Sequence, residues 1–453
     1  MPSLLPTVLV LVLPVSAAIC QGPNWPGFRG PKLDGVSLDA KPPLTWSDDE
    51  HINWQVDLPG PGSSSPVVKD GRVYVASYSG YGKYLDDGGD KSKLVHHLSC
   101  YSQEDGKQLW SKGVPGPLKQ EARQMQLTEH GFASPTPVVG DGMVFCYFGR
   151  AGVIAFSLDG EQLWRTDLGE PDPKAAIASN QVRRNGKVLS LKWGFAASPI
   201  LHDDLLIVNC SEESNSIRAL RQSTGELVWK HESANLEGTA ITPVVFGAGD
   251  EAVLVMVLGG EIWGMNPNTG EFFWRIKTAT NGGMSSTPIA DGDTAYVFGG
   301  DDISYAIRWA RTIPDSGPKP EGKAAPEGEA TDPRILWTSK SVAIPSPSLY
   351  KGKLLAVRSN GFGLCIDPAN GKVLRDKRLA GRTSGVYASP VVANDRIYVV
   401  SRTDGTFVYS TDGKFDLLAK NELSDKAQFN ASPALSGTQL LLRSDKTLYC
   451  IEQ

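Results

Sequence analysis

Short apolar segments separated by turn residues recur at a regular interval along the chain. Eight of them follow a Ser-Pro or Thr-Pro pair, at Pro66, Pro137, Pro199, Pro243, Pro288, Pro347, Pro390 and Pro433. The closest of these prolines are 43 to 45 residues apart, and three units are enlarged. A strand, a turn and a second strand follow each proline, as in VVANDRIYVVS after Pro390. This period is typical of a four-stranded blade, so the pattern predicts an all-β, eight-bladed β-propeller.

A second signature closes the repeating unit. A turn glycine precedes a tryptophan by four residues at Gly106, Gly160, Gly225 and Gly270. Six tryptophans occupy the equivalent place on the predicted outer strand: Trp54, Trp110, Trp164, Trp229, Trp274 and Trp337. Because six equivalent copies indicate architecture, we expect these rings to pack one blade against the next rather than to hold a cofactor.

The eighth unit lacks an outer strand of its own. Two apolar segments follow Pro433, whereas residues 51–58 carry the outer-strand pattern, with Trp54, ahead of the first blade. We expect this N-terminal strand to complete blade eight, which removes the open strand edge that would otherwise promote aggregation.

Composition and charge narrow the function classes. The 453 residues include 48 Gly and 31 Pro, which excludes a helical bundle, and the net charge of -5 provides no general basic field for nucleic acid. Residues 3–18 form an apolar run, so we interpret residues 1–18 as a signal peptide, 19–45 as an N-terminal extension and 46–453 as the propeller. The mature protein is expected to be periplasmic or secreted, without a transmembrane segment, and monomeric.

The six cysteines show no metal-ligand spacing. Cys20 leaves open a lipoprotein alternative, although Ala17 and Ile19 depart from the usual residues around a lipidated cysteine. The other five are expected to be buried free thiols: Cys100, Cys146, Cys210, Cys365 and Cys450.

The glycine–tryptophan repeat, of the form D/N-x-x-T-G-K/E-x-x-W, resembles that of the bacterial pyrroloquinoline-quinone-like (PQQ-like) eight-bladed propellers. WPGFRGP, at residues 25–31, is similar to a secreted subgroup of them. The resemblance implies two functional classes. One comprises quinoprotein alcohol dehydrogenases, which hold pyrroloquinoline quinone with Ca²⁺. The other comprises non-catalytic propellers like the outer-membrane assembly lipoprotein BamB, which bind protein partners.

Candidate catalytic residues favour the second class. The dehydrogenases often carry two adjacent cysteines against the quinone, and no such pair occurs here. The acidic groups Asp301-Asp302 and Asp86-Asp87-x-x-Asp90 are interpreted as loop residues, and His96-His97 as surface or core polar residues. We therefore expect a binding module or scaffold with no catalytic residue, no metal and no cofactor. A quinone-dependent dehydrogenase is the alternative.

The insertions predict which face binds. Residues 79–97, 113–131 and 169–193 should all emerge on one face over blades one to three, whereas residues 311–334 emerge on the other. The 169–193 loop is locally basic, and it contains Arg183, Arg184, Lys192 and Trp193. Together with His130, these residues are predicted to bind a protein or an anionic ligand.

Overall fold

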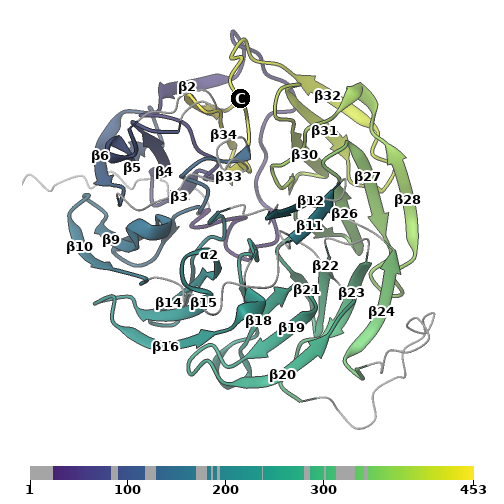
Figure 1. Ribbon diagram of the computed structural model, residues 1–453. Coiled ribbons are helices and arrows are strands. Elements are labelled where there is room, and N and C mark those ends of the chain that lie inside the picture. The colour runs from purple at the N-terminus through teal and green to yellow at the C-terminus, as the bar shows by residue number, and fades with distance from the viewer. Residues whose placement is uncertain are drawn as a thin grey trace, which may run out of the picture.

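The computed structural model is an all-β ring of eight four-stranded sheets (Figure 1). It describes residues 24–82, 90–117, 129–169, 181–184, 187–190, 194–236, 238–279, 286–299, 303–312, 332–340 and 345–453, with backbone only for 181–184 and 187–190. The predicted eight-bladed propeller is confirmed. The core lies between neighbouring sheets, because each buried apolar cluster joins residues of at least two blades.

The strands of each blade are antiparallel and run outward in chain order as A, B, C and D. Blades one to four comprise β3 (Val67–Lys69), β4 (Arg72–Ser79), β5 (Val95–Ser102) and β6 (Gln108–Pro115); β7 (Val138–Val139), β8 (Met143–Tyr147), β9 (Val153–Ser157) and β10 (Gln162–Thr166); β13 (Ile200–His202), β14 (Leu205–Cys210), β15 (Ser216–Arg221) and β16 (Leu227–Glu232); and β17 (Val244–Phe246), β18 (Val253–Leu258), β19 (Glu261–Met265) and β20 (Phe272–Lys277).

Blades five to eight comprise β21 (Ile289–Asp291), β22 (Thr294–Phe298), β23 (Ile303–Arg308) and β24 (Ile335–Lys340); β25 (Ser348–Tyr350), β26 (Lys353–Val357), β27 (Phe362–Ile366) and β28 (Val373–Arg378); β29 (Val391–Ala393), β30 (Arg396–Val400), β31 (Thr406–Ser410) and β32 (Leu417–Asn421); and β33 (Ala434–Ser436), β34 (Gln439–Arg443), β35 (Thr447–Ile451) and β2 (Ile52–Asp57). The described helices are short: α2 (Ser211–Ser214), η1 (Lys91–Lys93), η2 (Gly149–Ala151), η3 (Ala234–Leu236), η4 (Gly249–Glu251) and η5 (Ala380–Arg382).

The ring closes as the sequence predicts. Strand β2 pairs antiparallel with β35, with Trp54 opposite Cys450. The last blade therefore takes three strands from the C-terminus and its outer strand from the N-terminus. The prediction of buried free thiols is also confirmed for the five cysteines from Cys100 onward.

The Ser/Thr-Pro motif forms an inner belt of hydrogen bonds between blades. The backbone N–H of Ser65 donates to Thr136 Oγ1, that of Thr136 to Ser198 Oγ, and that of Ser198 to Thr242 Oγ1, each at 3.0 Å. The same link joins Thr287 to Ser346, Ser346 to Ser389 and Ser389 to Ser432. The hydroxyl thus joins successive blades, and the proline that follows has no N–H to satisfy.

The outer tryptophans contact the next blade around the ring. The indole N–H of Trp110 donates to Leu158 O at 2.8 Å, and those of Trp54, Trp164, Trp229 and Trp337 make equivalent bonds. Trp274 differs: its indole N–H has no partner among the described residues, and the guanidinium of Arg334 lies 5.0 Å from its ring centroid. Arg334 directly precedes β24, where the insertion of blade five replaces the usual tight hairpin.

Every outer strand contains a bulge at the residue before the tryptophan position. In β10, Gln162 pairs with Phe156 and Trp164 with Ala155, so Leu163 is the extra residue. The same shift in the other blades leaves Asn53, Leu109, Val228, Phe273, Leu336, Leu374 and Leu418 extra. A bulge twists an edge strand away from regular pairing, so the outer rim of the ring is poorly suited to edge-to-edge association.

The N-terminal extension crosses the centre of the ring, where the purple chain lies in Figure 1. Trp25 exchanges two backbone hydrogen bonds with Val68 of blade one, and Pro26 O accepts one from Val139 of blade two. Strand β1 (Val36–Ser37) pairs parallel with β29 of blade seven. The N–H of Lys41 donates to Gly437 O, in the A–B turn of blade eight. The extension is therefore a plug at the end of the channel that carries the A–B turns.

Arg29 is the central residue of this plug. Its side chain is fully buried, and it donates to the carbonyl oxygens of Leu33, Asp34, Ser346 and Pro347. Gly30, with φ +80°, lies against the Trp25 ring, where a Cβ atom would be only 2.8 Å from Cε3. The WPGFRGP motif thus supplies the plug with the Trp25 indole, a tight turn at Gly30 and the buried cation of Arg29.

Candidate functional site

A cavity of about 740 Å³ opens at the end of the ring opposite the plug. It is lined from the D–A connections 57–62, 129–131 and 426–430 and from the B–C turns at Arg402 and 445–446. D–A and B–C connections share one face of an antiparallel propeller, so the cavity lies over blades seven, eight and one. The sequence predicts binding on this same face, but over blades one to three.

Arg402, in the B–C turn of blade seven, joins distant parts of this face. Its Nη1 lies 2.8 Å from Oε2 of Glu129 in the connection between blades one and two, and its Nε donates to Gln428 Oε1 at 2.9 Å. The guanidinium also lies 5.3 Å from the centroid of the half-exposed Tyr387 ring. These contacts hold the Arg402 charge in a fixed place on the cavity wall.

The blade-eight side of the cavity contains polar groups with few partners. The Asp445 carboxylate accepts one long hydrogen bond, from Gly62 N at 3.5 Å. Burial raises the pKa of Asp445, and the nearby Arg443 opposes this rise. Asn430 lines the same cavity, and its Oδ1 atom is buried without a partner among the described residues.

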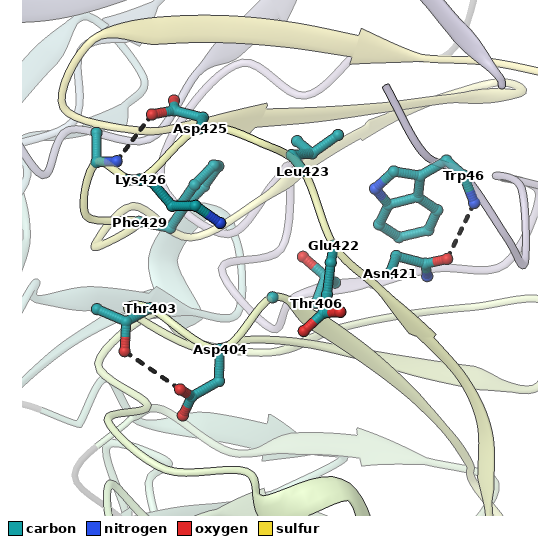
Figure 2. A pocket seen from close by; sticks show the side chains of 12 residues that line it. Trp46, Thr403, Asp404, Thr406, Asn421, Glu422, Leu423, Asp425, Lys426 and Phe429 are labelled. Carbon is teal, nitrogen blue, oxygen red and sulfur yellow. Dashed lines mark hydrogen bonds between the residues drawn. The ribbon is translucent and has the colours of Figure 1, made fainter. Parts of the chain in front are cut away.

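A smaller pocket of about 290 Å³ adjoins the cavity and shares Lys426 and Ala427 with it. Figure 2 shows Lys426 extending into this pocket, with the carboxylates of Asp404 and Glu422 below it and the Trp46 indole at one side. Trp46 is buried, and its backbone N–H donates to Asn421 Oδ1 at 2.9 Å. The pocket therefore combines a buried aromatic wall with charged side chains, of which Glu422 and Lys426 are exposed.

The molecule resembles proteins of known family over nearly the whole ring. A family model described as outer membrane protein assembly factor BamB matches residues 48–191, 96–326 and 213–453. The chain belongs to the BamB family.

One relative and two solved structures resemble the chain at 10–25% sequence identity. The outer membrane protein assembly factor BamB of Shewanella oneidensis is 25% identical over 331 residues, which covers 59% of this chain and 82% of that protein. The crystal structure of BamB from Moraxella catarrhalis superposes with a TM-score of 0.60 at 12% identity, covering 88% and 96% of the two chains. A computationally designed protein, Ika8, gives 0.52 at 10% identity, covering 88% and 98%. The two structural matches show the fold alone.

This BamB-family chain brings one of the predicted binding residues to the cavity. His130 lines it, and its Nδ1 is hydrogen-bonded to Ser134 Oγ. Arg183 and Arg184 lie in β11 (Gln181–Arg184), which pairs with β12 (Lys187–Ser190) in a hairpin seen against the centre of the ring in Figure 1. Lys192 and Trp193 lie outside the described residues. A joint surface made by these residues stays a prediction.

The cavity residues that sequence reasoning missed are Arg402, Asp445 and Asn430. They stand in SRTDG, RSDKT and FNASP, which look like ordinary turn and connecting sequences. Their proximity arises from ring closure, which brings blades seven, eight and one together. No local signal in the sequence distinguishes them.

The acidic and histidine residues considered as metal ligands are only partly described. Within the described ranges, no group of three or more His, Cys, Asp or Glu side chains could hold a metal ion. Asp90 instead caps η1, accepting from Ser92 N at 2.9 Å, while Asp86, Asp87, Asp301 and Asp302 lie outside those ranges. His96 is buried, with its ring stacked on Phe148 at a centroid distance of 5.0 Å.

Proposed function

We propose that this BamB-like propeller is a non-catalytic binding module, exported to the periplasm or beyond, that docks protein partners on the face bearing the D–A connections. One observation carries the proposal. The plug occupies the opposite end of the channel, whereas this end has the cavity and the adjoining pocket. The name of the S. oneidensis relative, an outer membrane protein assembly factor, supports a role in assembly with other proteins.

Export rests on the apolar run of residues 3–18. Across the described part of the chain, no helix is long and apolar enough to cross a membrane. Cell fractionation and N-terminal sequencing of the mature protein test export directly. A cytoplasmic protein that keeps Met1 would contradict it.

Site-specific photocrosslinking tests the docking face. A benzoylphenylalanine at Lys426, which is exposed and lines both pockets, should give discrete adducts in the native host. The same probe at Asp141, in the A–B turn of blade two, is the matched control at the plug end. Adducts at Asp141 with none at Lys426 would mean that partners dock at the plug end, which would contradict the proposal. In the same assay, Arg183→Ala/Arg184→Ala tests whether the hairpin contributes.

We also propose that the protein does not bind pyrroloquinoline quinone tightly. The sequence has no adjacent cysteine pair, and the described residues contain no group of three or more His, Cys, Asp or Glu side chains that could hold a metal ion, which supports this proposal. Titration with pyrroloquinoline quinone and Ca²⁺ should show no binding in the micromolar range. Tight binding with dye-linked alcohol oxidation would instead favour the dehydrogenase alternative.

A further inference from the structure

The cavity contains a carboxylate with unused hydrogen-bonding capacity. A carboxylate can accept about four hydrogen bonds, but from the described residues Asp445 accepts only the 3.5 Å bond from Gly62 N. Asp425, in the same region, is more fully satisfied. It accepts from Ala427 N at 2.8 Å, from Tyr449 Oη at 3.1 Å and from Ser444 Oγ. Asp445 therefore has more unused hydrogen-bonding capacity than Asp425.

The neighbouring buried cation does not satisfy Asp445 directly. Arg443 is 1% exposed and donates from Nη1 to Ser64 O and Ala76 O, on the adjoining blade. Its Nη2 has no hydrogen-bond partner among the described residues. Arg443 thus joins blade eight to blade one and stabilises the charge of Asp445 through space, without a hydrogen bond to it. The Asp445 carboxylate lines the cavity and can accept further hydrogen bonds there.

A second acceptor lies in the same cavity. Asn430 Oδ1 is buried without a hydrogen-bond partner in the described part of the chain, and it comes from the connection between blades seven and eight. Among the described residues, no basic side chain of the cavity lining donates a hydrogen bond to these acceptors. Arg402 is engaged with Glu129 and Gln428 and acts on Asp445 through its charge, while Lys426 and Lys446 are exposed. The exposed Asp57 adds a third carboxylate to the lining, beside Glu129 and Asp445.

We propose that this cavity receives an arginine side chain of a docking partner, with Asp445 and Asn430 accepting hydrogen bonds from its guanidinium. A guanidinium presents five donors in a planar fork, which suits two acceptors carried by different chain segments. Asp445 and Asn430 Oδ1 present acceptors on the blade-eight side of the cavity, and an arginine suits them better than an anion does, because an anion carries no donor. The volume of about 740 Å³ lies within the roughly 300–1,000 Å³ of pockets that hold small ligands. The inference rests on the proposed docking face and names the chemistry of its partner.

Model ligands test the site without a known partner. We would titrate the full chain with N-acetyl-arginine amide and with N-acetyl-citrulline amide, its neutral isostere, by NMR or calorimetry. The arginine derivative should bind more tightly by about tenfold or more, as expected when a hydrogen bond gains a charge. Equal binding of the two compounds would overturn the proposal.

Variants of the cavity residues test which side chains bind the arginine derivative. Asp445→Asn should weaken the arginine derivative by about tenfold or more, and Asn430→Ala should weaken it less. Lys446→Gln should strengthen binding, because it removes a like charge from the cavity wall. Asp141→Asn, at the plug end, should leave it unchanged. Thermal melts confirm that each variant folds, and if Asp445→Asn does not, Asn430→Ala and Lys446→Gln still decide. If Asn430→Ala and Lys446→Gln both bind the arginine derivative as the unmodified protein does, the proposed site is wrong.

The experiments distinguish a failure of the proposed docking face from a failure of the proposed arginine site. If adducts form at Lys426 but the arginine derivative does not bind, the docking face stands and the arginine site is wrong. If the derivative binds through Asp445 but no adduct forms at Lys426, the arginine site stands and protein docking at this face is wrong.

Discussion

Glycine positions in the outer turns are fixed by the tryptophan of the preceding blade. Gly371, in the turn between β27 and β28, has φ +71°, and a Cβ atom there would lie 2.5 Å from Trp337 Cε3. Gly352, in the A–B turn of the same blade, has φ +69°, with no atom within 4 Å of such a Cβ. The two glycines have similar φ values and differ mainly in that the Trp337 indole packs against Gly371.

This pair gives a matched prediction. Alanine at either site incurs the left-handed backbone penalty of about 1–2 kcal/mol. Gly371→Ala should lose a further 1–3 kcal/mol or so, because the methyl group displaces the indole. Urea denaturation of the two variants measures the difference. Equal losses would mean that the Trp337 contact contributes nothing to stability.

His231 makes the stability of blade three depend on pH. Burial lowers its pKa below the usual 6.5, the nearby Arg275 lowers it further, and Glu232 opposes the shift. The ring lies edge-on to Phe272 and Trp263, with centroids 4.7 and 5.1 Å away. Because the unfolded chain takes up the proton first, stability is greatest above pH 6.5 and falls as the pH drops below it.

His231→Gln should therefore cost more stability at pH 8 than at pH 5. The substitution removes the aromatic contacts at both pH values but removes the protonation penalty only at the lower one. Thermal melts of both proteins at the two pH values measure this. A stability difference that does not change with pH would contradict the lowered pKa.

At the scale of the strand, the hydroxyls before six of the eight repeat prolines connect neighbouring blades. Ser198 accepts from Thr136 N and donates its own N–H to Thr242, and all three residues are buried. Ser198→Ala should cost about 1–3 kcal/mol, because it leaves a buried N–H without an acceptor. Ser198→Thr keeps the hydroxyl and should be nearly neutral. Denaturant titration compares the two, and equal losses would argue against the hydroxyl belt.

Element order, blade count and closure were predictable because they depend on local periodicity and on counting strands. The bulges were not, because adjacent apolar residues such as Leu163 and Trp164 look like one buried stretch. In the structure Trp164 packs inward, whereas Leu163 is 46% exposed. The plug was also missed, since its partners lie about 40 to 400 residues away. The cavity depends on the same long-range proximity, and only His130 was anticipated.

At the scale of the whole molecule, β2 holds the ring closed. It pairs with β35 over Ile52–Asp57, and Trp54 binds blade one through Gln103 O. Deletion of residues 46–58 should lower the melting temperature sharply and promote dimers or aggregates, because the edge of β35 is then open. Calorimetry and size-exclusion chromatography check this, with a chain that starts at residue 24 as the control. A monomer that melts like the control would show that closure does not depend on β2.

Ring closure also determines when the protein can finish folding during its biosynthesis. Strand β2 is made early, but its partner β35 lies about 390 residues later in the chain. Arg29 must likewise wait for Ser346 and Pro347, which are 317 and 318 residues away, so neither its contacts nor the seam can form until these later blades have been made. The N-terminal segment remains an unpaired strand until then, which is the interval in which such strands aggregate. A cell that makes this propeller therefore has to protect residues 24–57 until the last blade arrives.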